Sequence, residues 1–386
     1  MSLPAMTEHA ACRTRHPGGD HAADLKHDLR TVARRFDIRG DFVRAAPYGS
    51  GHINDTYCVE FDQAGPPVRY LFQRINDLVF KDPAALMDNI SRVTAHLAEK
   101  YADSGDRGRR ALTLVPTHDG ASFCRDDLGG CWRVYRFIEK ARTYDAVQSP
   151  AQAFEAAKAF GHFQQLLGDL PAPRLHDTIP GFHDTPKRFA ALEDAVSADE
   201  MTRAVSAKAE IEFALRHKAM TRVLLDANLP ERVTHNDCKL NNVMFDDATG
   251  EGVCVIDLDT VMPGLALYDF GDMVRTTTSP ALEDERDLSK VTMQFPMFEA
   301  LARGYLAAAS GFLTTAERRH LATAGKLITF EIGIRFLTDH LRGDTYFKVH
   351  HAGHNLDRCR TQFRLVQSIE QQEDKMQRLV DSLVEF

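Results

Sequence analysis

Two polar stretches in the middle of the chain carry the residues best suited to chemistry. The first, "VTHNDCKLNNVMF", contains Asp237, Lys239 and Asn242, and the second, "GVCVIDLD", is an apolar run that ends in Asp257 and Asp259. A carboxylate can orient and deprotonate an attacking hydroxyl group, and Mg²⁺ prefers oxygen ligands. Phosphoryl transfer from ATP needs few other protein groups. The pattern therefore predicts a kinase in which Asp237 is the base and Asn242 and Asp257 hold Mg²⁺; for a lone Asp–Asn pair, a hydrophilic turn before a hairpin would be the simpler interpretation.

Another aspartate competes with Asp257 for the metal. Asp269 lies in "LYDFGDMV" and forms a literal Asp-Phe-Gly, the triplet that holds magnesium in protein kinases. Asp257 directly ends an apolar strand beside the first polar stretch. Asp269 instead precedes the helical pattern "FGDMVRTT", where a short carboxylate more often caps a helix or buttresses a loop. We therefore predict that Asp257 is the metal ligand and that Asp269 is structural.

The elements that must position these residues change character along the chain. Up to about residue 140, short β-branched and aromatic runs such as "TYCVEF", "RYLFQRI" and "CWRVYRFIE" alternate with Gly and Pro turns, which predicts strands. Asp82 and Pro83 open a helix between them. From about residue 150 the chain is mostly amphipathic helix, with a short β insertion at 233–257. We predict an α+β, bilobal fold with a mobile arm (1–27), a small β-rich N-lobe (28–140) and a large helical C-lobe (141–386).

A kinase also needs groups that hold the nucleotide, and the N-lobe offers candidates. The turn "YGSGHIND" contains Gly49, Ser50 and Gly51, whose backbone N–H groups can approach phosphate oxygens; a plain hairpin turn is the alternative. Arg74 is the basic residue of "YLFQRIN" and suits the α and β phosphates, unless it simply faces solvent. Lys239 would neutralise the transferring phosphoryl group or lie exposed. The predicted hinge beside adenine contains Tyr135 and Phe137.

Composition excludes several other classes of protein. The chain has 386 residues, 44% of them hydrophobic, and a net charge of −8, which argues against a general nucleic-acid binder. No apolar run approaches the roughly 18 residues that span a bilayer. The first residues lack the apolar core of a signal peptide, and the seven cysteines form no CxxC pair. We expect a cytoplasmic enzyme with small-molecule ligands and no obligatory protein partner.

The order of these parts resembles the aminoglycoside and choline phosphotransferase group of the protein-kinase-like fold. More closely, the chain resembles the N-acetylhexosamine 1-kinase family across roughly residues 40 to 350, in "GHINDTY", "LFQRIN", "YRFIEKARTYD", "THNDCKLNNVMFD", "VIDLDTVMPGLALYDFGD" and "RFLTDHLRGDTYF". The resemblance implies phosphorylation of the anomeric hydroxyl of N-acetylglucosamine or N-acetylgalactosamine with ATP and Mg²⁺. It also implies that His52, Arg335 and Tyr346 line the sugar site beside Asp237.

Several alternatives stay open at this point. Arg335 follows Glu331 by four residues, so the two could form an ion pair on one helix face instead of a sugar site. The segment after "YDFGDMVR" is "TTTSPALEDERDLSKV", where sugar kinases of the family have an aromatic residue and a glycine, so the exact acceptor is open. The helix after "LFQRIN" offers only Asp88 or Asn89 to pair with Arg74. Kinases of aminoglycosides, choline or another alcohol are the runner-up; a pseudokinase would be expected to lose Asp237, Asn242 or Asp257.

Overall fold

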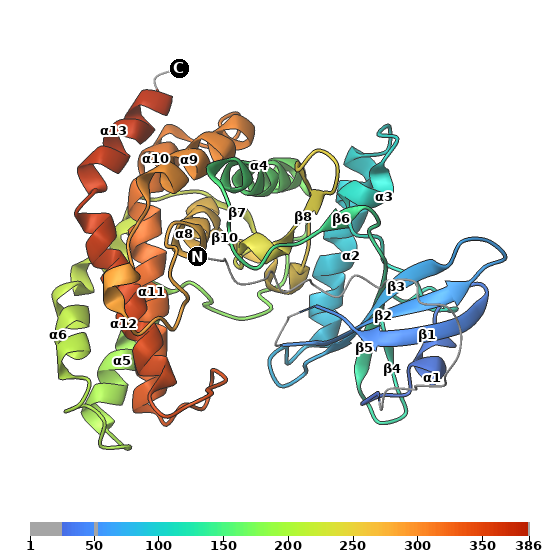
Figure 1. Cartoon of the computed structure of the whole chain (residues 1–386), viewed down its shortest axis with the longest axis horizontal. Coiled ribbons are helices and arrows are strands. Elements are labelled where there is room, and N and C mark those ends of the chain that lie inside the picture. Colours follow the sequence, from blue (N-terminus) through green and yellow to red (C-terminus); the bar gives the residue numbers. More distant parts are fainter. Residues whose placement is uncertain (1–24, 50–52, 385–386) are drawn as a thin grey trace, which may run out of the picture.

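The computed structural model describes residues 25–49 and 53–384, which form a sheet-rich lobe and a helical lobe (Figure 1). The smaller lobe is built on a five-stranded antiparallel sheet with the strand order β1-β2-β3-β5-β4. Its strands are β1 (Asp41–Pro47), β2 (Asp55–Asp62), β3 (Val68–Ile75), β4 (Cys124–Arg125) and β5 (Cys131–Arg136). The helices of this lobe are α1 (Leu29–Ala33), α2 (Pro83–Lys100) and α3 (Arg107–Arg110).

The two faces of this sheet have different neighbours, because successive side chains of a strand point to opposite sides. One face carries Phe72 and Trp132 and packs against Leu29 of α1 in a hydrophobic cluster confined to the N-lobe. The other face carries Ile75 and Tyr135, which belong to the largest hydrophobic cluster together with residues of the helical lobe. The face that carries Tyr135 is therefore the one turned toward the helical lobe.

Helix α2 begins where the sequence predicts. The side chain of Asp82 accepts hydrogen bonds from the backbone N–H groups of Ala84 (3.1 Å) and Ala85 (3.0 Å), and Pro83 occupies the first helical position. The apolar positions Leu86, Ile90, Val93 and Leu97 form the buried face of this helix. The helix connects the sheet to the rest of the molecule and packs into the shared core (Figure 1).

The helical lobe contains the remaining α-helices. They are α4 (Pro150–Leu166), α5 (Thr185–Ala198), α6 (Lys208–Arg216), α7 (Val223–Asp226), α8 (Ala266–Thr277), α9 (Phe295–Ala309), α10 (Thr315–Arg319), α11 (Leu321–Leu341), α12 (His354–Glu370) and α13 (Glu373–Val384). Helices α4 and α9 approach each other closely, since a Cβ built on Gly304 would lie only 2.2 Å from the carbonyl oxygen of Phe154. Among the described residues, no helix is long and apolar enough to cross a membrane.

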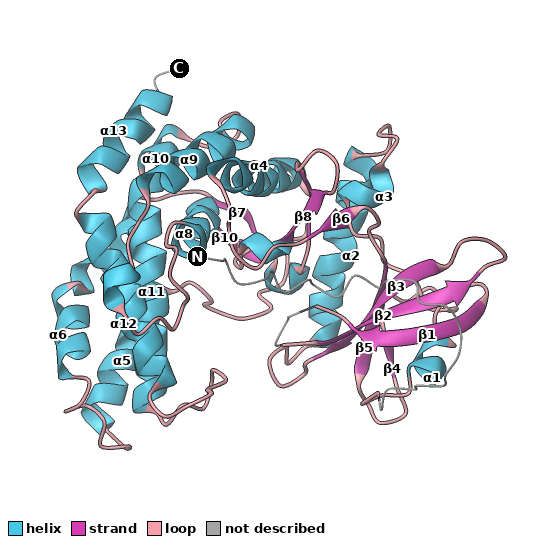
Figure 2. Cartoon of the chain, in the orientation of Figure 1, coloured by secondary structure: helices cyan, strands magenta, loops and turns pink. Residues whose placement is uncertain are grey.

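Short strands and 3-10 turns hold the polar stretches at the inner side of the helical lobe (Figure 2). The strands are β6 (Ala141–Arg142), β7 (Glu231–Thr234), β8 (Val243–Asp246), β9 (Gly252–Val255) and β10 (Met262–Leu265), and the turns are η1 (Leu167–Asp169), η2 (Lys218–Arg222), η3 (Leu240–Asn242), η4 (Leu258–Thr260) and η5 (Leu288–Lys290). Strands β7 and β10 pair, and β6, β8 and β9 form a second small sheet. The predicted small β-rich N-lobe and large helical C-lobe are confirmed.

Candidate active site

The loop between β7 and β8, which we call the catalytic loop (residues 235–242), presents the carboxylate of Asp237. Asn242 donates from Nδ2 to the backbone oxygen of Asp237 (2.8 Å) and to its Oδ2 (3.1 Å). The ammonium group of Lys239 lies 2.8 Å from the other carboxylate oxygen. Burial opposes ionisation of Asp237, but the charge and hydrogen bond of Lys239 outweigh it and hold the pKa of Asp237 below its usual value. The structure therefore brings the three predicted residues of this loop together.

Asp269 of α8 holds the backbone of the catalytic loop through hydrogen bonds. The carboxylate of Asp269 is fully buried and accepts hydrogen bonds from the backbone N–H groups of His235 (2.8 Å) and Asn236 (2.7 Å) and from Nε2 of Gln164 (2.6 Å). Burial raises the pKa of Asp269, and the hydrogen bonds favour its ionised form. Asn236 has a positive φ of 64°, so the backbone needs this support to present the next residue. The prediction that Asp269 buttresses a loop is confirmed.

Asp257 follows β9 and stands beside the catalytic loop. It also has a positive φ, of 60°, and no hydrogen bond or ion pair holds its carboxylate within the part of the chain that the structure describes. Although its side chain reaches solvent, the surrounding protein and the negative charges of Asp259 and Asp237 raise the pKa of Asp257 to about 6. The carboxylates of Asp237, Asp257 and Asp259 thus lie near one another, and the nearby Arg133 pairs with Asp259 rather than with Asp257.

Asp259, two residues further on, is held quite differently. Its carboxylate is buried and forms an ion pair with the guanidinium group of Arg133 on β5. It also accepts a hydrogen bond from Nδ2 of Asn54 (2.6 Å), which follows the glycine-rich turn. Nε of Arg133 in turn donates to the side chain of Gln73 on β3 (3.0 Å). This buried network joins the sheet of the N-lobe to the loop that carries Asp257.

Arg74 lies on the other face of the sheet. It stands opposite Trp132 in the register of β3 and β5, so both side chains lie on the face that packs against α1. A Cβ built on Gly130 would lie 2.7 Å from Nε of Arg74 and 2.8 Å from Oδ2 of Asp126, so the guanidinium group sits beside that carboxylate. The structure does not bring Arg74 together with the catalytic loop.

Neither residue of α2 considered as a partner for Arg74 contacts it. The carboxylate of Asp88 lies 3.6 Å from Arg92 and 3.2 Å from the ring of His176. Asn89 is buried, and its Nδ2 donates to backbone oxygens in the segments after α4 and β9. Neither residue of α2 is therefore available to Arg74, which lies on the sheet face that packs against α1.

The nucleotide candidates are only partly described. Ser50, Gly51 and His52 lie outside the described residues. Gly49 has a φ of 79°, and a Cβ built on it would meet nothing within 4 Å, so its conformation rather than crowding favours glycine. The ring of Tyr48 packs edge-on against Phe137 at 5.3 Å, which places the predicted hinge beside the glycine-rich turn. Tyr135 is buried, and its hydroxyl has no hydrogen-bond partner among the described residues.

Arg335 of α11, predicted to line a sugar site, does not form the ion pair considered from the sequence. Glu331 is fully buried and contacts Nδ1 of His183 at 2.8 Å instead. The guanidinium carbon of Arg335 lies 5.0 Å from the ring centre of Phe182 and 5.9 Å from that of Phe347. Such positions suit cation–π contacts, and among the described residues no hydrogen bond or ion pair engages the guanidinium group of Arg335.

Tyr346 lies in the loop that follows α11. Its ring packs edge-on against Phe347 at 4.8 Å, and 61% of the residue is exposed. The loop that carries it is ordered by Asp339, whose carboxylate accepts hydrogen bonds from the backbone N–H groups of Tyr346 (2.8 Å) and Phe347 (2.9 Å). Arg335 and Tyr346 thus lie on adjoining elements at one face of the helical lobe.

The threonine-rich segment after α8 begins inside the helix. Thr276 and Thr278 donate from their hydroxyl groups to carbonyl oxygens one turn earlier, at 2.8 Å each. Arg275 pairs with Asp272 (2.8 Å) and, beyond the helix, with Glu283 (2.9 Å). These contacts fold the segment back toward α8.

Sequence reasoning missed Arg133 and Asn54. Arg133 occupies the middle of "CWRVYR", a run that is otherwise mostly buried, and a fully buried charge needs a partner. That signal was available in the sequence, but the partner was not, because Asp259 is 126 residues away.

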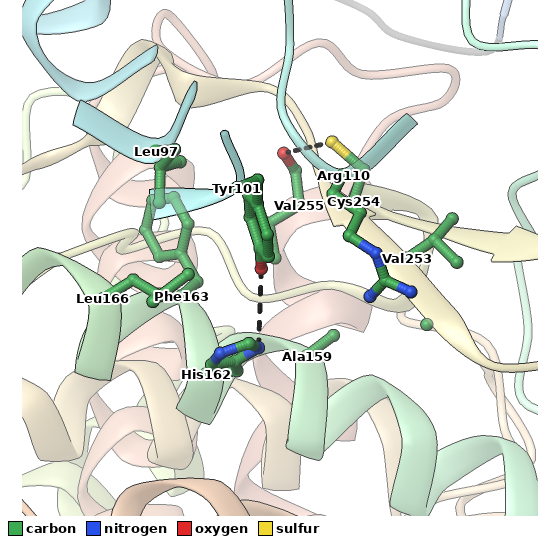
Figure 3. Close-up of a pocket in the computed structure, with 11 residues that line it drawn as sticks. Leu97, Tyr101, Arg110, Ala159, His162, Phe163, Leu166, Val253, Cys254 and Val255 are labelled. Carbon is green, nitrogen blue, oxygen red and sulfur yellow. Dashed lines mark hydrogen bonds between the residues drawn. The ribbon is translucent and has the colours of Figure 1, made fainter. Parts of the chain in front are cut away.

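A small cavity lies away from these residues (Figure 3). Residues of α2, α3, α4 and β9 line it, and among the described lining residues none belongs to the catalytic loop. The hydroxyl group of Tyr101 lies 3.5 Å from Nδ1 of His162 across it. This cavity is part of the packing behind β9 rather than of the candidate active site.

Several solved structures share the fold of this chain. A microcompartment-associated aminopropanol kinase is 14% identical with a TM-score of 0.56, over 90% of this chain and 98% of that one. An aminoglycoside phosphotransferase from Alicyclobacillus acidocaldarius is 13% identical with a TM-score of 0.56, over 95% and 98%. A spectinomycin phosphotransferase, solved with ADP and spectinomycin, is 12% identical with a TM-score of 0.51, over 87% and 94%. The fold is therefore that of the aminoglycoside phosphotransferase-like kinases.

The family model described as "Phosphotransferase enzyme family" matches residues 44–319, which include the glycine-rich turn, the catalytic loop, Asp257 and Asp269. This chain belongs to that family. It is a phosphotransferase.

Proposed function

We propose that this phosphotransferase transfers the γ-phosphate of ATP to the anomeric hydroxyl group of an N-acetylhexosamine, giving the sugar 1-phosphate. The observation that carries the transfer reaction is the arrangement of Asp237, Asn242 and Asp257. Asp237 is held by two polar neighbours and stays ionised, while Asp257 beside it has no hydrogen-bond or ion-pair partner among the described residues. The choice of sugar rests on the sequence resemblance and on Arg335 and Tyr346.

The residues present suit a divalent cation. Asp257 carries a negative charge that the described residues leave unpaired, and burial together with the charges of Asp259 and Asp237 raises its pKa to about 6. Asn242 donates its amide N–H groups to Asp237, which leaves its Oδ1 available as a ligand. Asn242 and Asp257 would hold Mg²⁺, which would neutralise charge on the phosphate oxygens. Within the described residues no group of three or more His, Cys, Asp or Glu side chains could hold a metal by itself, so the phosphates would supply further ligands.

The nucleotide would lie between the glycine-rich turn and the hinge at Tyr135 and Phe137, with the lobes 28–140 and 141–386 acting as the two halves of the site. The ADP complex of the structurally similar spectinomycin phosphotransferase supports nucleotide binding by this fold. Gly49, Ser50 and Gly51 would contact phosphate oxygens. Arg74 would have to leave Asp126 to reach them, and we assign the phosphoryl group to Lys239 instead.

In the reaction, Asp237 would accept the proton of the acceptor hydroxyl group as that oxygen attacks the γ-phosphorus. Lys239 would offset the charge of the transferring phosphoryl group. Arg335, Tyr346 and His52 would hold the sugar so that its hydroxyl group lies in line with the phosphate, because orientation supplies much of the rate of such a reaction. We expect the enzyme to work in the cytoplasm on free sugars.

The proposal is tested by measuring ATP consumption with N-acetylglucosamine, N-acetylgalactosamine, choline, ethanolamine and aminoglycosides. An N-acetylhexosamine should be the best acceptor, and proton-coupled phosphorus NMR should show a 1-phosphate. A 6-phosphate product, or faster turnover of choline or an aminoglycoside, would assign a different acceptor to the same family fold.

A further inference from the structure

Two arginines without an acidic partner lie at the acceptor side of the helical lobe. Arg335 of α11 rests over Phe182 and Phe347, as described above. Arg188 of α5 donates from Nε (3.3 Å) and from an Nη atom (3.0 Å) to the backbone oxygen of Phe182. Neither guanidinium group forms an ion pair within the described parts of the chain, and both side chains are half-buried.

The two positive charges act on each other. Burial lowers the pKa of Arg188, and the charge of Arg335 lowers it further. The nearby carboxylates are engaged with other groups: Glu331 contacts His183, and Asp184 caps α5 by accepting from the backbone N–H of Lys187 (3.1 Å). Glu331 and Asp184 weaken the positive potential here, but neither of them pairs with an arginine. Among the described residues, Arg188 and Arg335 therefore keep N–H groups that no carboxylate accepts, and both side chains contact Phe182.

This pair lies next to the catalytic loop. Nε2 of His183 is 3.4 Å from the backbone oxygen of Asn236, the residue before Asp237. Phe182, which touches both arginines, precedes this histidine and packs against its ring at 4.7 Å. The phenol of Tyr346 is near enough to Arg188 to affect its ionisation. Helices α5 and α11 pack together here, so both arginines reach the acceptor side from neighbouring elements (Figure 1).

We propose that Arg188 and Arg335 form a charge filter, which rejects acceptors that carry an ammonium group and binds a carbonyl or carboxylate oxygen of the acceptor. The inference rests on the proposed function only for where the acceptor lies. An ammonium group placed against two guanidinium groups is repelled, and a partly desolvated site strengthens that repulsion. A carbonyl or carboxylate oxygen would instead accept the free N–H groups of Arg335. The acceptor would then lack the ammonium group of an amino alcohol, which is the kind of substrate that the name of the aminopropanol kinase indicates.

The experiment compares N-acetylglucosamine with glucosamine, which has an ammonium group in place of the amide, at a pH that keeps the amine protonated. The wild-type enzyme should favour N-acetylglucosamine in kcat/KM by about tenfold or more. Arg188→Gln and Arg335→Gln should each reduce this preference several-fold, while the KM for ATP stays unchanged. Arg188→Lys keeps the charge but loses the hydrogen bonds to Phe182, and it should retain the preference.

Lys187→Gln is the matched control, because Lys187 lies on the same helix with its side chain exposed. It should leave the preference unchanged. Equal turnover of the two sugars by the wild type, or a preference that Arg188→Gln does not change in a variant with normal melting temperature, would overturn the filter. Loss of the preference in Arg188→Lys as in Arg188→Gln would do so too, because the role of Arg188 would then be structural.

Failure of the sugar assignment gives a different result. If no hexosamine is phosphorylated, the proposed function fails, and the filter is then tested on the alcohol that the acceptor screen identifies. That alcohol should outperform its amine analogue by the same criterion, and its acid analogue should bind at least as well. A cationic alcohol as the best acceptor would overturn the filter and the sugar assignment together.

Discussion

Asp237 is ionised because Lys239 stands 2.8 Å from its carboxylate, and this has a chemical consequence. A carboxylate with a lowered pKa is fully available as a proton acceptor at neutral pH but is a weak base. It therefore suits an acceptor hydroxyl group that is more acidic than an ordinary alcohol, as the anomeric hydroxyl of a reducing sugar is. Asn242 fixes the orientation of the same carboxylate from the other side.

The first prediction concerns this base. Asp237→Asn removes the proton acceptor while keeping the size of the side chain, so kcat should fall by roughly 10² to 10⁴. Binding of ATP, measured by calorimetry, should change little. Asp247→Asn, on the exposed turn after β8, is the control and should keep full activity. An Asp237→Asn enzyme with nearly normal turnover would contradict the assignment.

The second prediction compares Asp257 with Asp269. The carboxylate of Asp269 is buried and accepts three hydrogen bonds, whereas that of Asp257 accepts none among the described residues. Asp257→Ala should abolish Mg²⁺-dependent turnover and leave the melting temperature nearly unchanged, since no described contact holds its carboxylate. Asp269→Ala leaves two buried backbone N–H groups without a partner, at a cost on the order of 1–3 kcal/mol each. It should lower the melting temperature by several degrees. A stably folded Asp269→Ala enzyme that cannot use Mg²⁺ would mean that the two roles are reversed.

At the scale of elements, helix α8 positions the catalytic loop and must itself be fixed. It packs against α11 at Gly271, where an added Cβ would lie 2.5 Å from the carbonyl oxygen of Ala324 and 2.6 Å from a side-chain carbon of Ile328. The contact with Ala324 is to backbone, which cannot move aside as a flexible side chain does. Gly271 therefore determines how closely α8, which holds the catalytic loop, can approach α11.

The third prediction tests this packing. Gly271→Ala should destabilise the protein by about 1–3 kcal/mol in the free energy of unfolding, because overpacking displaces the helix. Gly311→Ala, where an added Cβ meets nothing within 4 Å, is the control and should have little effect. Denaturant unfolding followed by fluorescence measures both. A Gly271→Ala protein as stable as the control would show that α8 can shift without cost.

At the scale of the whole molecule, the Arg133–Asp259 pair links the two lobes through the protein interior. Asn54, which follows the glycine-rich turn, also donates a hydrogen bond to the carboxylate of Asp259. This carboxylate therefore binds both the sheet, through Arg133, and the segment after the glycine-rich turn. Both charges are removed from water, with side chains only 1% and 5% exposed. Removing one partner leaves the other as an unpaired buried charge.

The fourth prediction compares this pair with an exposed one. Arg133→Gln should cost about 3–5 kcal/mol in stability, whereas Arg142→Gln, which breaks the exposed pair with Asp247, should cost about 1 kcal/mol or less. Thermal unfolding of both variants measures the difference. Equal small losses would show that the lobes are held together without the buried pair.

The sequence predicts an interaction well when the groups that make it are close together in the chain. Asp82 caps α2, and Asp237, Lys239 and Asn242 share one loop, because the groups involved are at most five residues apart. A structural role for Asp269 was predicted from a place before a helix, whereas Asp269 lies in the first turn of α8, and only the fold shows which N–H groups it binds. The sheet face on which Arg74 lies was not predictable from the sequence. Alternation along a strand assigns residues to two opposite faces, but it does not tell which of these faces packs against the other lobe.

The sequence by itself predicted the bilobal fold class and the polar loop of Asp237, because periodicity, turn residues and motif spacing are properties of short segments. The resemblance of several short strings also pointed to the phosphotransferase family that the family model shows. Only the tertiary structure decided which charges meet. Asp259 pairs with Arg133 on a strand 126 residues earlier, and Arg188 of α5 and Arg335 of α11 both contact Phe182. Electrostatic and hydrogen-bond partners are chosen by distance in space, and packing of the two lobes is what brings distant segments within that distance.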